Sequence, residues 1–159
     1  MIRTMSVKET LTFSARTRLP RELSNTEIQK IVNSTIKLLG LYEIRHSLIG
    51  DEVTRGISGG QRKRVNIGIE VVSDPTVLFL DEPTSGLDSS SSKEVVSALN
   101  QLAHNLNLTI AAVIHQPRYE IFTLFDDVLL LGKGGKTVFF FFFFFFYFIF
   151  ICFCITLNT

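Results

Sequence analysis

The sequence predicts an α/β domain with a largely parallel sheet, followed by an uncharged apolar tail. In the first part, short runs of continuous apolar residues alternate with longer runs whose apolar residues recur at helical spacing. One short run ends in two adjacent acids, at the edge where such sheets bind ligands. The tail stands apart because eleven of the 15 phenylalanines fall between Phe139 and Phe153, whereas every charged residue lies at or before Lys136.

The composition is an average over these two segments, so the value of 46% hydrophobic residues describes neither of them. The roughly 136 residues before the tail are enough for one domain. A net charge of +1 gives no general attraction to nucleic acid. Both cysteines, Cys152 and Cys154, lie in the tail, so the first part has neither a disulfide framework nor a cysteine metal site. Residues 1–20 lack the apolar core of a signal peptide.

Two helices are predicted in the first half of the chain. One runs from about Asn25 to Leu39, because apolar residues recur at helical spacing after the capping box of Ser24 and Glu27. The other runs from Gly59 to Val72, behind Ser58 as its N-cap. The stretch between the two helices is expected to be irregular, with one short helical turn.

The second half alternates strands and helices. Val77 to Leu80 is a continuous apolar run after Pro75, and it predicts a strand that is buried on both faces. The capping-box spacing of Ser91 and Glu94 predicts the start of an amphipathic helix that ends near His104. The remaining expected elements are a strand at Thr109–Ile114, a short helix at Tyr119–Phe125, a strand at Val128–Leu131, a turn at 132–135 and a strand from Lys136 onward.

The start of the second predicted helix is suited to binding an anion. Gly59 and Gly60 allow backbone N–H groups to approach a ligand closely, and a helix N-terminus favours negative charge. Ser58 and Gln61 flank these two glycines. The alternative is an ordinary turn into a helix, in which these residue types are common.

Polar residues follow the first two predicted strands. Asp81 and Glu82 end the first strand. Asp81 can hold Mg²⁺ through its carboxylate, and Glu82 can polarise an attacking water. His115 follows the second strand and can contact a γ-phosphate. The alternatives are a solvated acidic pair, a structural histidine and, for Ser85 to Asp88, a turn with a helix cap.

Three motifs in a fixed order carry a family resemblance. They are ISGGQRKRV at 57–65, the strand into DEPTSGLD at 81–88 and VIHQPR at 113–118. Together with VKETL at 7–11, they closely resemble the nucleotide-binding domain of ABC transporters, specifically the G subfamily of the white/pleiotropic-drug-resistance type. The resemblance covers about residues 5–138.

The resemblance implies the C-terminal part of a P-loop NTPase fold of the ABC ATPase type. This partial domain would span residues 1–138, with a helical subdomain at about 9–72 and part of a mostly parallel core sheet at about 73–138. In that family, such domains couple ATP hydrolysis to the export of lipids, sterols or other amphipathic compounds. ATP and Mg²⁺ are the implied cofactors.

The resemblance also implies roles for the residues singled out above. Ser58 to Gln61 would be the signature motif, which closes over ATP held by a second nucleotide-binding domain. Asp81 would be the Walker B acid that holds Mg²⁺ through water, Glu82 the catalytic base and His115 the switch histidine. Asp88 would end the D-loop. The implied partners are a second such domain and a transmembrane domain, with the ATPase part on the cytoplasmic side of a membrane.

One motif of the family is missing from the sequence. The Walker A loop, Gly-x-x-x-x-Gly-Lys-Ser/Thr, cradles the phosphates of ATP. Residues 132–137 end in Gly-Lys-Thr, but Leu130 stands where the first glycine is required, and we interpret this stretch as a hairpin turn. The strand that carries Walker A, the base-stacking aromatic residue and the Q-loop glutamine are also absent.

We therefore expect that the chain alone neither binds ATP tightly nor hydrolyses it. Two other interpretations stay open. The chain is a non-catalytic fragment that donates its signature motif in trans to a partner, or it is an inactive fragment of a partial gene.

Two interpretations also stay open for the tail, residues 139–159. Val138 to Leu157 is a stretch of 20 residues without a charge, which is long enough for a transmembrane helix. Lys133 and Lys136 before it would favour a cytoplasmic domain. Alternatively, eight consecutive phenylalanines reflect a T-rich DNA tract that is read in frame. Phenylalanine is only a middling helix former, and its homopolymers tend to aggregate as β-structure.

Overall fold

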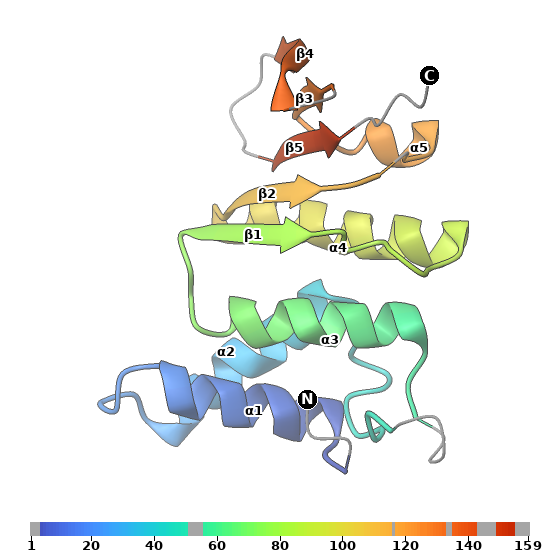
Figure 1. Cartoon of the computed structure of the whole chain (residues 1–159). Coiled ribbons are helices and arrows are strands. Elements are labelled where there is room, and N and C mark those ends of the chain that lie inside the picture. Colours follow the sequence, from blue (N-terminus) through green and yellow to red (C-terminus); the bar gives the residue numbers. More distant parts are fainter. Residues whose placement is uncertain (1–3, 51–55, 116, 133–134, 143–148, 155–159) are drawn as a thin grey trace. The chain divides into compact units, whose positions relative to one another are not determined.

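Helices make up the first part of the chain, and a sheet with two helices makes up the second (Figure 1). The computed structural model describes residues 4–50, 56–115, 117–132, 135–142 and 149–154. The chain divides into two units, Met1–Pro75 (unit 1) and Thr76–Thr159 (unit 2).

Unit 1 contains three helices, each of which begins at a capping box. They are α1 (Val7–Arg18), α2 (Asn25–Leu38) and α3 (Gly59–Val71), and their N-caps are Ser6, Ser24 and Ser58. In each box the serine side chain accepts a backbone N–H three residues on, and the Glu or Gln there accepts the N–H of the serine. The predictions of α2 and α3 are confirmed. Helix α1 was not predicted, although Ser6 and Glu9 have the same spacing.

The core of unit 1 lies where α1 packs against α2 and α3. Its fully buried side chains come from all three helices and include Leu11, Ile36 and Val65. Gly68 on α3 permits close packing, because a Cβ atom there would lie 2.8 Å from Cδ1 of Leu39 and 3.0 Å from Cδ2 of Leu11. The chain between α2 and residue 50 is tied back to α1, since Val7 donates its N–H to Ser47 O at 3.1 Å.

Unit 2 contains one five-stranded sheet in the order β1-β2-β5-β3-β4. All neighbouring strands are parallel except β3 and β4, which confirms the largely parallel sheet predicted from the sequence. The elements in chain order are β1 (Val77–Asp81), α4 (Ser89–Leu106), β2 (Thr109–Val113), α5 (Tyr119–Phe122), β3 (Asp127–Leu131), β4 (Thr137–Phe142) and β5 (Ile149–Cys154).

The middle strand of this sheet comes from the tail. β5 pairs with β2 from Ile110↔Ile149 and with β3 from Asp127↔Phe150, so it separates the two strands that flank α5 in the chain. The described residues of the tail are therefore extended, as the β-propensity of phenylalanine and isoleucine favours. The structure differs here from the interpretation of the tail as one long helix. Among the residues that the structure describes, no helix is both long and apolar enough to cross a membrane.

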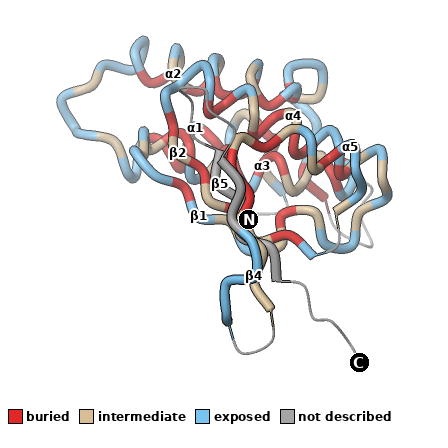
Figure 2. Tube along the Cα trace, turned by 90° about the horizontal axis from the view of Figure 1, so that it is seen from above, coloured by how far each residue is buried: buried red, intermediate tan, exposed pale blue. Residues whose placement is uncertain are grey.

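Two details of unit 2 differ from the sequence predictions. β1 is buried on one face only, since Leu78 is 5% exposed whereas Phe79 is 80% exposed. Successive side chains of a strand point to opposite faces, and β1 lies at the edge of the sheet. Helix α4 starts three residues earlier than predicted, because Asp88 rather than Ser91 caps it and accepts the backbone N–H groups of Ser90 and Ser91. Figure 2 colours each described residue by its burial, and the start of β4 is exposed.

Candidate functional site

The carboxyl ends of β1 and β2 bring the predicted acid and histidine together. The two strands are parallel, and Asp81 pairs with Val113, so the residues that follow each strand leave the sheet at the same edge. His115 Nε2 lies 3.0 Å from Glu82 Oε1, and both side chains are nearly half exposed. The contact fits a hydrogen bond donated by the imidazole N–H to the carboxylate. Two residues that are 33 positions apart in the sequence thus form one polar pair.

Glu82 is held at this edge by its backbone. Its N–H donates to Val113 O at 2.9 Å, which continues the β1–β2 ladder one residue beyond β1. Its φ angle is +46°, in the left-handed region that costs a non-glycine residue about 1–3 kcal/mol. Such conformations cluster at functional sites, and here the conformation places a carboxylate beside His115.

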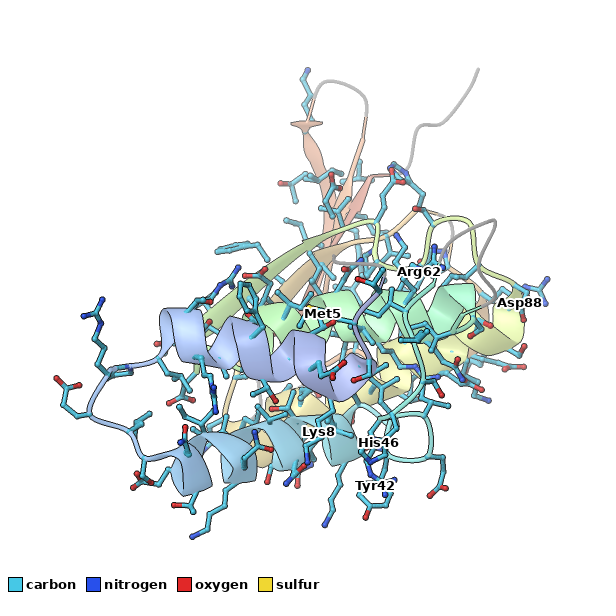
Figure 3. The ribbon with its side chains drawn as sticks, turned by 90° about the horizontal axis from the view of Figure 1, so that it is seen from below. Met5, Lys8, Tyr42, His46, Arg62 and Asp88 are labelled. Atoms are coloured by element: carbon cyan, nitrogen blue, oxygen red, sulfur yellow. The ribbon has the colours of Figure 1, made fainter. Side chains whose placement is uncertain are left out.

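The segment Ser85 to Asp88 forms a turn that leads into α4. Ser85 N–H donates to Glu82 O at 3.1 Å, and Gly86 takes a φ of +73°. The Asp88 carboxylate accepts the N–H groups of Ser90 and Ser91 at 3.1 and 3.3 Å, as well as the Ser90 hydroxyl. These donors hold the pKa of Asp88 far below its ordinary value. Figure 3 labels Asp88 at the start of α4. In the structure, Asp88 acts as the N-cap of α4.

The Ser-Gly-Gly-Gln motif forms the N-terminus of α3 in unit 1. Ser58 Oγ accepts the Gln61 N–H at 3.2 Å, and Gln61 Oε1 accepts the Ser58 N–H at 2.9 Å. Ser58 and Gly59 are exposed, whereas Gly60 is buried. The Ser58 hydroxyl accepts one hydrogen bond in this box and keeps its own proton for donation. The helix start therefore presents a donor and a positive dipole end to solvent, which suits an anion.

Asp81 ends β1 with an exposed side chain. A carboxylate at this position has the oxygen donors that Mg²⁺ prefers, together with waters and phosphates. Within the described part of the chain, no group of three or more His, Cys, Asp or Glu residues could hold a metal by itself. The donor set thus fits a metal that is held mainly by a bound phosphate and water, with one protein carboxylate.

The predicted site residues fall into two groups. Ser58 to Gln61 belong to unit 1, and Asp81, Glu82, Asp88 and His115 belong to unit 2. The structure brings Glu82 and His115 into contact and places the turn 85–88 directly after them. Sequence reasoning missed a cavity of about 270 Å³ in unit 2, which His115 lines together with Ser92 and Arg118. The motif VIHQPR contains both His115 and Arg118, so it was the available sequence signal for this cavity.

Comparison with known proteins gives a consistent family assignment. The family model described as ABC transporter matches residues 1–85. ABC transporter G family member 28 of Arabidopsis thaliana is 53% identical over 131 residues, which are 82% of this chain and 12% of that protein. The broad substrate specificity ATP-binding cassette transporter ABCG2 of Mus musculus is 49% identical over 136 residues, 86% of this chain and 20% of that protein. The chain thus spans a fifth or less of these relatives.

Solved structures agree on the fold. CbiO1 of Clostridium perfringens, part of the ABC transporter complex cbiONQ, matches with a TM-score of 0.69 at 28% identity, over 86% of this chain and 51% of that one. The ATP-binding cassette MJ0796, solved as a dimer in a post-hydrolysis state with ADP and Pi, matches with a TM-score of 0.66 at 20% identity, over 92% of this chain and 60% of that one. With its motifs in family order and its sheet in the family fold, the chain belongs to the ABC transporter family and carries part of a G-subfamily ATP-binding domain.

Proposed function

We propose that this chain supplies the catalytic edge and the signature motif of an ATP-hydrolysing subunit of a G-type ABC transporter. The observation that carries the proposal is the 3.0 Å contact between His115 and Glu82 at the carboxyl ends of two parallel strands. A capped and exposed signature helix in unit 1 supports it. As the chain spans 20% or less of its curated relatives, the activity belongs to a larger assembly.

In this function, Glu82 acts as a general base toward the attacking water. A carboxylate accepts several hydrogen bonds, so the bond from His115 leaves Glu82 able to accept another from water. His115 fixes the orientation of the carboxylate, and the left-handed backbone of Glu82 holds it at the sheet edge. Asp81 would hold Mg²⁺, which when bound neutralises charge on the phosphates of ATP.

Ser58, Gly59 and Gly60 would act on the ATP of a second nucleotide-binding domain. Ser58 and Gly59 are exposed, and the capping box of α3 leaves a hydroxyl proton and a helix N-terminus directed at solvent without further rearrangement. Asp88 would end the D-loop beside that partner. A transmembrane domain would complete the transporter, with the ATPase part on the cytoplasmic side, and lipids or other amphipathic compounds as the exported substrates.

We assign residues 9–72 to the helical subdomain and 73–138 to part of the core, a division close to that between units 1 and 2. The segment 139–159 is the apolar tail, of which residues 139–142 and 149–154 are extended.

The catalytic role can be tested by joining the chain to a Walker A half of known function. A chimera would join the upstream half of the ABCG2 ATP-binding domain to this chain. We expect ATP turnover in the chimera, a loss of about 100-fold or more with Glu82→Gln, because the general base is removed, and a loss with His115→Ala. Lys93→Gln, a surface change on α4, is the matched control and should keep turnover. Turnover that survives Glu82→Gln would contradict the assignment.

A second function is supported by the signature helix alone. Helix α3 is complete with its capping box at Ser58 and Gln61, and its start is exposed. The chain would then donate Ser58 to Gln61 in trans without hydrolysing ATP of its own. In this case a partner's turnover depends on Ser58 and is indifferent to Glu82.

A further inference from the structure

Asp127 is a buried carboxyl group of unit 2 that the proposed function does not use. It is the first residue of β3, it is 7% exposed, and its Oδ1 atom has no hydrogen-bond partner within the described part of the chain. Buried polar atoms are seldom left without a partner, because burial removes their hydrogen bonds to water. The cost is larger for a charged group than for a neutral one, so this position favours the protonated form of Asp127.

Two strands that contain residues of the tail flank Asp127. In the backbone register, Asp127 pairs with Phe142 of β4 on one side and with Phe150 of β5 on the other. The sequences of these two strands contain no Asp, Glu, Lys, Arg or His, and their titratable groups are Cys152 and Cys154, further along β5. Neither β4 nor β5 therefore supplies a cation that would compensate an ionised carboxylate.

The charge next to Asp127 acts in the same direction as its burial. Burial and the like charge of the adjacent Asp126 raise the pKa of Asp127 above its ordinary value. The ionisable groups of the preceding helix α5 are Tyr119 and Glu120, and Glu120 pairs with Lys93 at 3.2 Å. Because the folded pKa of Asp127 lies above that of the unfolded chain, the pairing of β3 is most stable below about pH 4. It loses stability as the pH rises through the folded pKa.

The start of β3 is held in place, so it cannot readily move to relieve this cost. Asn100 Nδ2 of α4 donates to Leu124 O at 2.9 Å, which ties the segment before β3 to α4. Phe125 and Val128, on either side of Asp127, are 4% and 1% exposed and belong to the core. β4, in contrast, lies at the edge of the described sheet. The strands of the tail are therefore the elements that yield when Asp127 loses its proton.

We propose that Asp127 makes the docking of β4 and β5 depend on pH: the two strands stay paired with β3 while its carboxyl group is neutral, and they loosen when it is ionised. β5 also pairs with β2, and His115 follows β2 in the chain. The charge of Asp127 is thereby coupled through β5 to the edge that carries the contact between His115 and Glu82. The proposal goes beyond ATP hydrolysis and does not depend on it.

The test is hydrogen exchange of the full chain between pH 4 and pH 8, with protection corrected for the intrinsic exchange rate at each pH. Helices α1–α3 of unit 1 serve as the internal reference. Relative to them, we expect the protection of β3, β4 and β5 to fall at least about tenfold toward pH 8, as for a charged group that is buried without a partner.

Three variants make the cause specific. Asp127→Asn keeps the shape of the side chain but cannot ionise, so the fall in protection should disappear. Asp127→Val replaces the carboxyl group by an apolar side chain that suits a strand, and it should raise protection at pH 8 above that of the unchanged chain. Glu22→Gln removes an exposed carboxylate between α1 and α2, and it is the matched control that should keep the fall.

Two outcomes would overturn the proposal. One is protection of β3, β4 and β5 that does not change with pH relative to α1–α3, and the other is a fall that Asp127→Asn retains. If Asp127→Asn does not fold, Asp127→Val decides, because its protection must also be independent of pH. The measurement involves no nucleotide, so an inactive chimera would leave this result untouched.

Discussion

The two units of this chain are specified in different ways. In unit 1, each helix begins at a serine with a Glu or Gln three residues on, and the helices pack directly on one another. In unit 2, the sheet is completed by a strand from the tail, which lies between β2 and β3. The signature motif therefore depends on local sequence, whereas the Glu82–His115 pair lies in a sheet that depends on residues 149–154. A change in the tail should therefore disturb the Glu82–His115 pair and leave the signature motif intact.

The largest expected effect follows from Ile151→Pro. Ile151 pairs with Ala112 of β2 and Val128 of β3, and proline removes an N–H from the middle of the sheet. We expect a cost comparable to the about 3 kcal/mol of a proline inside a helix. Hydrogen exchange should show loss of amide protection in β2 and β3, with α1–α3 unchanged. Protection of β2 equal to that of the unchanged chain would mean that β5 does not hold the sheet together.

The reciprocal change is Gly68→Ala in unit 1. The added Cβ would lie 2.8 Å from Leu39 Cδ1, and such overpacking costs about 1–3 kcal/mol. Amide protection should fall in α1 and α3, while β2 and β3 keep theirs. If either change lowers protection in both units, the two units do not fold independently.

A smaller effect is expected from Asp88→Ala at the start of α4. Hydrogen bonds from the Ser90 and Ser91 side chains and N–H groups lower the pKa of Asp88 in the folded state. Because the folded pKa lies below that of the unfolded chain, this stabilisation is fully present above about pH 4 and is lost as the pH falls through the folded pKa. The variant should therefore lose less stability on acidification than the unchanged chain. Asp88→Asn, which keeps a good cap without the charge, should share the weaker pH dependence.

The local elements of the fold were predictable, and the non-local ones were not. Helices α2 and α3 follow from a cap and apolar periodicity, and α1 has the same Ser6–Glu9 signal. The exposure of Phe79 depends on which elements cover each face of β1. The apolar run 77–80 does not encode this. The position of β5 depends on pairing with strands about 20 and 40 residues away, and no periodicity within the tail encodes it.

The candidate site divides in the same way. Motif order indicated Glu82 and His115, but their contact depends on the parallel register of Asp81 with Val113. The cap formed by Asp88 was one of the open interpretations of the turn. The cavity that His115 lines with Ser92 and Arg118 could not be predicted, because its walls come from α4 and from the segment after β2, which only the fold brings together.

The most direct test of the signature-motif assignment, which both proposed functions share, is ATP turnover in trans. A complete G-type nucleotide-binding domain whose own signature serine has been replaced would be mixed with this chain. The account predicts that the chain, inactive alone, restores turnover at the partner's ATP site, and that Ser58→Arg abolishes this gain whereas Glu82→Gln does not. Turnover by the chain alone that Glu82→Gln abolishes, or restoration that survives Ser58→Arg, would contradict it.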